Sequence, residues 1–284
     1  MCCTTTEPVS KRDCRATAQG RSSLKPRHLC SLRTLTSDSL FKLADAALLL
    51  TLHVEIGRNR RFPDVCNETK SALQLLRSIF PTDKFSPGFP PIVMKHQLYA
   101  MVQTRSDVEK ALDMMMEQGM VRTFCLAPHE AELAIVFTED YVSYVRQRVS
   151  HSLLIESFVD KVVTPLWDLS YSHAFLTRQL EFQEADISEL VRAGLLTPRN
   201  EPSRWWIGVP GSTGFARTLI RGRTALLQML RRSKHHELPR TEVESSRLPR
   251  STKLGTAYYV YDAIGSGLVA CVKTTSGDIL RLRE

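Results

Sequence analysis

The chain has 284 residues, of which 43% are hydrophobic and 24% are charged. This is the composition of an ordinary globular protein with room for two or three small domains, and it excludes a largely disordered chain. The formal net charge is +8, so an anionic partner such as nucleic acid is the first kind of partner to test.

The seven cysteines are scattered and never spaced Cys-x-x-Cys, and the histidines have no second ligand at metal spacing. We therefore expect no metal, no cofactor and a reducing compartment. The most apolar run, residues 43–54, is well short of the roughly twenty residues that span a bilayer. No membrane segment is expected, and the N-terminal sequence argues against secretion.

The charge is unevenly distributed along the chain. Residues 1–60 carry ten basic and five acidic side chains, and residues 215–253 carry ten and three. Residues 61–214, which lie between these two regions, carry fifteen basic and nineteen acidic side chains, so the middle of the chain is acidic. Residues 1–60 are rich in Ser, Thr and Arg with little periodicity, so we expect a basic, largely disordered region with a short helix at 37–54.

One short pattern occurs three times: two apolar residues three apart, three more positions, then glycine and two apolar residues. The glycines are Gly119, Gly194 and Gly267. Apolar residues at this spacing form one face of a helix, and a following glycine is the usual left-handed residue that ends it. Each copy therefore predicts a helix that stops at glycine and turns directly into a strand.

Each glycine is followed by an extended stretch, a polar turn and a second extended stretch, which is the outline of a β-hairpin. The expected strand pairs are 120–126 with 133–138, 195–198 with 205–209, and 268–274 with 279–282. The helices expected before the hairpins are 68–80 and 92–102, then 152–166 and 172–180, then 214–233 and 240–246, with a last one at 257–265.

Three helices and a hairpin in about 70 residues are typical of the winged-helix variant of the helix-turn-helix. We therefore expect an α+β, mainly helical fold with three tandem winged-helix domains. Their predicted boundaries are 61–149, 150–213 and 214–284. A chance recurrence of the glycine pattern within one mixed α+β domain is the alternative.

The helix before each hairpin would normally enter the major groove, and here none has a basic face. In the first unit Arg105 is followed by four acidic residues, and in the second Glu184, Asp186 and Glu189 stand against Arg192 alone. The third has tyrosines and no basic residue. Readout of base edges is therefore not expected from any of the three.

The basic charge lies instead on the first helix of the third unit. At 100° per residue, Arg217, Arg221, Arg231 and Arg232 fall on one face and the leucines on the opposite one, with Arg223 as an exception near the apolar side. Lys234 and Arg247 extend the positive region. Such a face predicts salt-sensitive, sequence-tolerant phosphate contacts, and a solvated amphipathic helix is the alternative.

Four segments closely resemble the serine/threonine-protein kinase 19 family: PPIVM at 90–94, IVFTEDY at 135–141, SRWWIGVPG at 203–211 and TTSGDILRL at 274–282. The similarity covers about residues 68–284. It implies three tandem winged helices, a nuclear, chromatin-bound protein and binding to double-stranded DNA. It further implies a part in transcription-coupled nucleotide excision repair beside stalled RNA polymerase II and the repair helicase complex, and leaves open a homodimer on DNA.

Carried over by position, the family's DNA contacts fall on Arg105, Arg217, Arg231, Arg232 and Lys234. Arg247 lies near another basic position of the family, which is Ser246 here. The family name also implies a kinase, but the chain lacks the glycine-rich loop, strand lysine, catalytic aspartate and metal-binding aspartate that a kinase needs.

The sequence thus predicts a non-enzymatic DNA-binding repair scaffold. A kinase or kinase-associated regulator is one alternative, and an adaptor that binds only protein is another. Because Glu184, Asp186 and Glu189 would repel phosphate and attract a basic surface, we expect the middle unit to dock protein.

Overall fold

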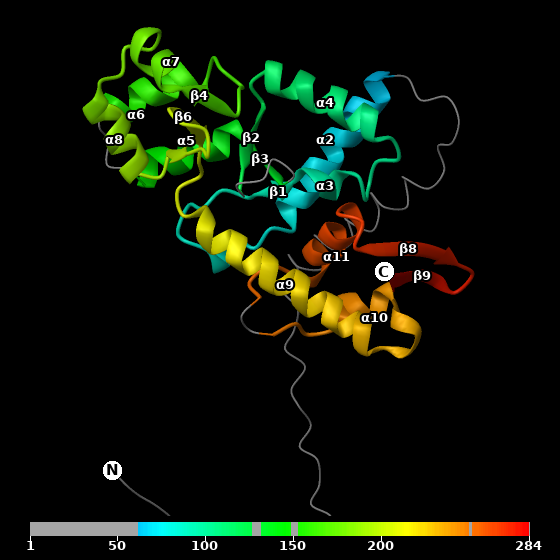
Figure 1. Ribbon diagram of the computed structural model, residues 1–284. Coiled ribbons are helices and arrows are strands. Elements are labelled where there is room, and N and C mark those ends of the chain that lie inside the picture. Colours follow the sequence, from blue (N-terminus) through cyan, green and yellow to red (C-terminus); the bar gives the residue numbers. More distant parts are fainter. Residues whose placement is uncertain (1–61, 127–131, 149–152, 250–251, 284) are drawn as a thin grey trace, which may run out of the picture. The chain divides into compact units, whose positions relative to one another are not determined.

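A computed structural model describes residues 62–126, 132–148, 153–249 and 252–283, all of which belong to one compact unit. The region 1–60, including the helix expected at 37–54, lies outside the described residues. The fold is mixed, with helices and three small antiparallel sheets (Figure 1). In each sheet the strand that comes last in the sequence lies in the centre; the strand orders are β1-β3-β2, β4-β6-β5 and β7-β9-β8.

The first sheet and its helices occupy residues 62–148. In chain order the elements are α2 (Phe62–Ser78), a 3-10 turn (Thr82–Lys84), β1 (Val93–Met94), α3 (Lys95–Leu98), α4 (Arg105–Glu117), β2 (Val121–Cys125), β3 (Leu133–Phe137) and α5 (Thr138–Arg148). The helix expected at 92–102 is confirmed only at Lys95–Leu98, and the prediction is wrong at both ends. Val93 and Met94 pair instead with Ile135 and Ala134 as a short edge strand, since both side chains are fully buried there.

The second sheet and its helices occupy residues 153–207. The elements are α6 (Leu153–Phe158), a π-helical turn (Val159–Val163), β4 (Ser170–Ser172), α7 (His173–Arg178), α8 (Glu184–Arg192), β5 (Leu196–Pro198) and β6 (Arg204–Ile207). The expected hairpin is present, and β4 adds a third strand that pairs with β6.

The third sheet and its helices occupy residues 212–282. The elements are α9 (Ser212–Arg232), a turn (Lys234–His236), β7 (Glu237–Pro239), α10 (Arg240–Ser245), α11 (Thr256–Gly265), β8 (Val269–Thr274) and β9 (Gly277–Leu282). Again a strand that the periodicity did not indicate, β7, completes the sheet. A strand of three residues is too short for its alternation to be read from sequence.

The three predicted helix ends are confirmed. Gly119, Gly194 and Gly267 have φ of 70°, 78° and 78°, and each stands between a helix and the following strand. A left-handed residue closes the last turn and redirects the chain, and glycine adopts it without a Cβ clash. The same local sequence signal therefore produces the same helix-to-strand corner in all three places.

One hydrophobic cluster runs through all three groups of elements, so their cores are continuous. It includes Phe124 of β2, Leu190 of α8 and Leu226 of α9, each at most 1% exposed. Polar contacts also connect the groups: the hydroxyls of Tyr141 and Tyr144 on α5 donate to the carbonyl oxygens of Gly208 and Pro210, at 2.9 and 2.8 Å. The segment leading into α9 is thereby held against α5.

Arg122 makes a further connection that the sequence did not indicate. This β2 residue is only 4% exposed, and its guanidinium donates to the carbonyl oxygens of Val162, Val163 and Leu166 at the end of the π-helical turn. The end of a helix leaves such oxygens without backbone partners, and a cation there is favourable. Arg122 thus fixes the second group of elements to the first sheet.

Candidate nucleic-acid interface

The long helix α9 owes its orientation to one apolar face. Five positions along it, spaced three to four residues apart, are buried: Phe215, Leu219, Gly222, Leu226 and Leu230. This spacing places them on one side of an α-helix, which packs against α11 and β9. The opposite side of α9 is consequently left to solvent.

That solvent side carries the basic residues predicted from the helical periodicity. Arg217, Arg221, Arg231 and Arg232 are exposed, and Lys234 is exposed in the turn that follows. We call these five residues the ridge. None of them forms an ion pair with another described residue, and α9 contains no acidic residue. Arg217 and Arg231 are 14 positions apart, about 21 Å along the helix axis.

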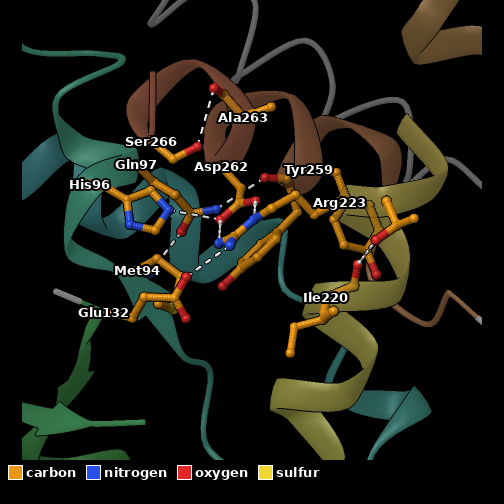
Figure 2. A network of polar contacts seen from close by, with 12 residues as sticks. Met94, His96, Gln97, Glu132, Ile220, Arg223, Tyr259, Asp262, Ala263 and Ser266 are labelled. Atoms are coloured by element: carbon orange, nitrogen blue, oxygen red, sulfur yellow. Dashed lines mark hydrogen bonds and ion pairs between the residues drawn. The ribbon is translucent and has the colours of Figure 1, made fainter. Parts of the chain in front are cut away.

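Arg223, the exception in the predicted face, points into the protein (Figure 2). Its Nε and Nη2 donate to the two carboxylate oxygens of Asp262 on α11 at 2.8 and 2.9 Å, and its Nη1 donates to Glu132 at 2.8 Å. The bond to Asp262 is the main reason that the pKa of Arg223 lies above its ordinary value. Arg223 therefore orients α9 rather than binding an external anion.

Asp262 also accepts a hydrogen bond from the other side. His96 of α3 lies with Nε2 2.7 Å from Asp262 Oδ1, and Asp262 itself is fully buried. Burial alone would raise the pKa of this carboxyl group, but the hydrogen bonds from His96 and Arg223 outweigh it and hold the pKa below its ordinary value. The cluster connects α3, α9 and α11, which come from opposite ends of the described sequence (Figure 2).

The helix before the third hairpin, α11, is enclosed by its neighbours. Tyr258, Tyr259 and Asp262 are 0% exposed, and Tyr261 is 5% exposed. The hydroxyl of Tyr258 donates to the carbonyl oxygen of Ile92 at 2.8 Å. With α3 on one side and α9 on the other, α11 cannot enter a DNA groove without leaving the core.

Arg105, at the start of α4, is exposed but does not lie on the ridge helix. Its guanidinium stacks on the ring of Tyr99, 5.0 Å from the centroid. The helix that it begins packs against α2 and β2, whereas α9 packs against α11 and β9 (Figure 1). Arg247 is likewise exposed, in the segment between α10 and α11. The ridge is therefore one surface, and these two arginines belong to other elements.

The acidic residues of α8 differ from one another in the structure. Ile187 and Leu190 are buried as expected, and Glu189 is exposed. One carboxylate oxygen of Asp186 accepts a hydrogen bond from the Gln183 backbone at 2.8 Å and so caps the helix. Glu184 pairs with Nε2 of His173 at 2.7 Å, although its side chain remains 75% exposed.

Sequence reasoning missed Arg122, Asp262 and His96 as organising residues. An arginine in an apolar β-strand and an aspartate in an apolar helix are the signals that could have indicated buried partners, because such charges are rarely buried unpaired. Nothing in the local pattern identifies the partner. Two further findings concern the described residues alone: no three metal-ligating side chains come together, and no helix is long and apolar enough to cross a membrane.

Comparison with known proteins connects this arrangement to one family. Relatives with the name "Winged helix repair factor 1" are 36% identical over 218 residues in Homo sapiens and 34% identical over 229 residues in Xenopus laevis. The alignments cover 76% and 78% of this chain, and 85% and 86% of the relatives. A relative of the same name in Dictyostelium discoideum is 20% identical over 253 residues, and the alignment covers 74% of this chain and 63% of the relative.

The family description that matches residues 59–282 is "Inactive serine-threonine protein kinase 19". The matched range contains the three sheets, the ridge and the buried cluster around Asp262. The chain belongs to this inactive serine-threonine protein kinase 19 family, whose relatives at about 35% identity are winged-helix repair factors.

Proposed function

We propose that this protein is a non-enzymatic scaffold that binds double-stranded DNA with little regard to sequence and acts in nucleotide excision repair coupled to transcription. The relatives' name supports a repair-related winged-helix factor. The observation that carries DNA binding is the ridge, a row of exposed cations that spans about 21 Å without an acidic neighbour on its helix. Nuclear, chromatin-associated location follows from the same proposal.

The proposed architecture is three winged-helix units with boundaries at 61–149, 150–213 and 214–284. In support, each range contains helices and one three-stranded sheet, in which the strand that comes last in the chain lies in the centre. Each also has the left-handed glycine before the second strand of its sheet. The shared core makes the three units one body in the described part of the chain.

The proposed mode of binding is contact with phosphates rather than with base edges. The helices in the usual reading position are α4 and α8, which are rich in acidic residues, and α11, which is buried. Guanidinium groups on one helix face can instead follow the backbone of either strand. Arg105 and Arg247 would then be separate contacts, made where the duplex passes other parts of the protein.

The ridge is tested by reversing its charges in the full chain. Arg217→Glu, Arg231→Glu and Lys234→Glu together should abolish duplex binding and leave the melting temperature nearly unchanged, since all three side chains are exposed. The matched control reverses three other exposed cations, Lys70, Arg178 and Lys110. If both variants weaken binding equally, the net charge and not the ridge is responsible.

The same binding assay tests tolerance of sequence. Randomised duplexes should bind within a few fold of one another. Four to five phosphate contacts should give a plot of log affinity against log salt with a slope of about −4. Discrimination of about 10³ for one sequence would be typical of base readout and would contradict the proposal.

For partners, we propose RNA polymerase II and transcription-coupled repair factors, including the repair helicase complex, with the acidic face of α8 as a docking surface. The exposed Glu189 and the largely exposed Glu184 support a contact with a basic protein surface. A homodimer on DNA remains compatible with this scheme. An adaptor that binds protein alone is the competing function, and it predicts no effect of the ridge variant on any activity.

A further inference from the structure

The turn after α9 contains two consecutive histidines in a conformation that favours glycine. His235 and His236 have φ of 62° and 57°. Among the described residues, Glu181 and Ser203 are the other non-glycine residues with positive φ, and they are isolated. Glycine or asparagine would adopt the left-handed conformation at a lower cost than histidine.

The two imidazole side chains make few contacts that would stabilise the fold. Both side chains are exposed, and His235 makes no hydrogen bond with another described residue. His236 Nδ1 lies 3.1 Å from the carbonyl oxygen of Arg231. A carbonyl oxygen only accepts, so Nδ1 donates there, and Nε2 is the remaining polar atom of that ring. Strained residues persist where the surroundings or a function require them, and no side-chain contact with the described residues accounts for the conformation of His235.

The neighbouring charges favour an anion beside these rings. Arg231, Arg232 and Lys234 of the ridge immediately precede the pair and are exposed. The nearest acidic residue along the chain is Glu237, whose carboxylate is bound by Arg281 at 2.9 Å. The turn therefore presents two exposed imidazole rings at the end of a row of cations that lacks a competing carboxylate on its helix.

We propose that His235 and His236 contact the phosphate backbone of bound DNA, and that the left-handed turn exists to direct both rings to it. The proposal rests on the proposed function of the ridge and extends the phosphate track past its C-terminal end. His235 would donate from the ring nitrogen that carries its proton. His236 would donate from Nε2 in its imidazolium form, because its Nδ1 already donates to the carbonyl oxygen of Arg231. Phosphate oxygens are strong acceptors, and hydrogen bonds to charged groups are among the stronger ones in proteins.

The test is a strain-relief experiment in the full chain. His235→Gly with His236→Gly should raise the melting temperature by roughly 2–4 °C, because glycine removes the left-handed strain. The same variant should bind duplex DNA roughly tenfold more weakly, with a shallower dependence on salt. His235→Asn with His236→Asn, which also suits the left-handed conformation, should weaken binding without loss of stability.

Ser203→Gly is the matched control, because Ser203 is exposed with φ of 60° in the turn between β5 and β6, outside the ridge. It should raise the melting temperature in the same way and leave DNA affinity unchanged. Unchanged affinity in both histidine variants would overturn the proposal. In that case, the ridge variant decides whether the proposed function stands. If the ridge variant loses DNA binding, the proposed function stands without the histidines. If it retains DNA binding, the proposed function fails as well.

Discussion

Asp262 is the residue on which the packing of α9 and α11 most depends. It is fully buried, and it is compensated by His96 on one side and by two hydrogen bonds from Arg223 on the other. A buried carboxylate without such partners would be costly, and removing one partner of a buried pair leaves the other charge uncompensated. The polar cluster therefore specifies one arrangement of three helices.

We expect Asp262→Asn to lower the free energy of unfolding by about 3 kcal/mol at pH 7, since Arg223 then loses its main partner. The folded-state pKa of Asp262 is lowered, so the carboxylate stabilises the protein above the unfolded-state pKa of about 3.9. This contribution is lost as pH falls through the folded-state pKa. Urea unfolding should therefore show wild type and variant converging in acid, and a constant difference down to pH 2 would contradict this role.

At the scale of elements, close approach between helices is permitted by two glycines without positive φ. A Cβ at Gly222 of α9 would overlap the ring of Tyr259, and one at Gly265 of α11 would overlap the carbonyl oxygen of His96. Tyr259 is fully buried and its hydroxyl donates to the carbonyl oxygen of Thr218 at 3.0 Å, so the ring has no room to move. These glycines let α9 and α3 pack directly on α11.

We expect Gly222→Ala to destabilise the protein by about 1–3 kcal/mol, because the added methyl group overpacks the contact with Tyr259. Gly214→Ala in the same helix is the control. A Cβ at Gly214 meets nothing within 4 Å, so alanine there should stabilise by about 0.5–1 kcal/mol. Chemical denaturation measures both, and effects of the same sign would show that helix propensity rather than packing decides.

The acidic face of α8 leads to a prediction about docking. Glu184→Lys with Glu189→Lys should leave DNA affinity equal or higher and reduce recruitment to stalled polymerase or to the repair helicase complex by roughly tenfold. Co-precipitation after transcription-blocking damage, beside a DNA-binding curve, measures the two effects. Glu117→Lys with Glu139→Lys, two exposed carboxylates on other helices, is the control. Loss of DNA binding with intact recruitment would reverse the assigned roles.

At the scale of the whole molecule, the family description and the sequence motifs bear on whether this protein has kinase activity. The family description is of an inactive kinase, and the described residues form three small sheets joined by one core. A kinase positions phosphates and magnesium with a glycine-rich loop, a strand lysine and two aspartates, and the sequence contains none of these motifs.

We therefore expect the purified protein neither to bind Mg-ATP with useful affinity nor to transfer phosphate. Calorimetric titration with Mg-ATP and a phosphate-transfer assay are the measurements. Phosphorylation by a contaminating kinase would survive any single substitution of an aspartate in this chain. If one such substitution eliminated the activity while the protein remained folded, the enzymatic alternative would be restored.

Much of the fold could be predicted because its signals are local. The apolar spacing of α9 and the glycines at 119, 194 and 267 each report a few neighbouring residues, and the structure confirms both. The arginine face of α9 follows from the same periodicity, since residues opposite an apolar stripe must face solvent. What the sequence by itself determined is therefore the helix-to-strand corners and the position of the cationic ridge.

The tertiary structure alone decided the rest. Asp262 and His96 are 166 residues apart, and Arg122 lies 40 residues or more before the carbonyl groups that it binds. The edge strands β1, β4 and β7 are two or three residues long and exist only because a central strand pairs with them. Such pairings depend on what distant segments bring to the same place, so no local period records them. For the same physical reason, helical periodicity places Arg223 near the apolar side of α9, but only the folded chain shows that it binds Asp262 and Glu132.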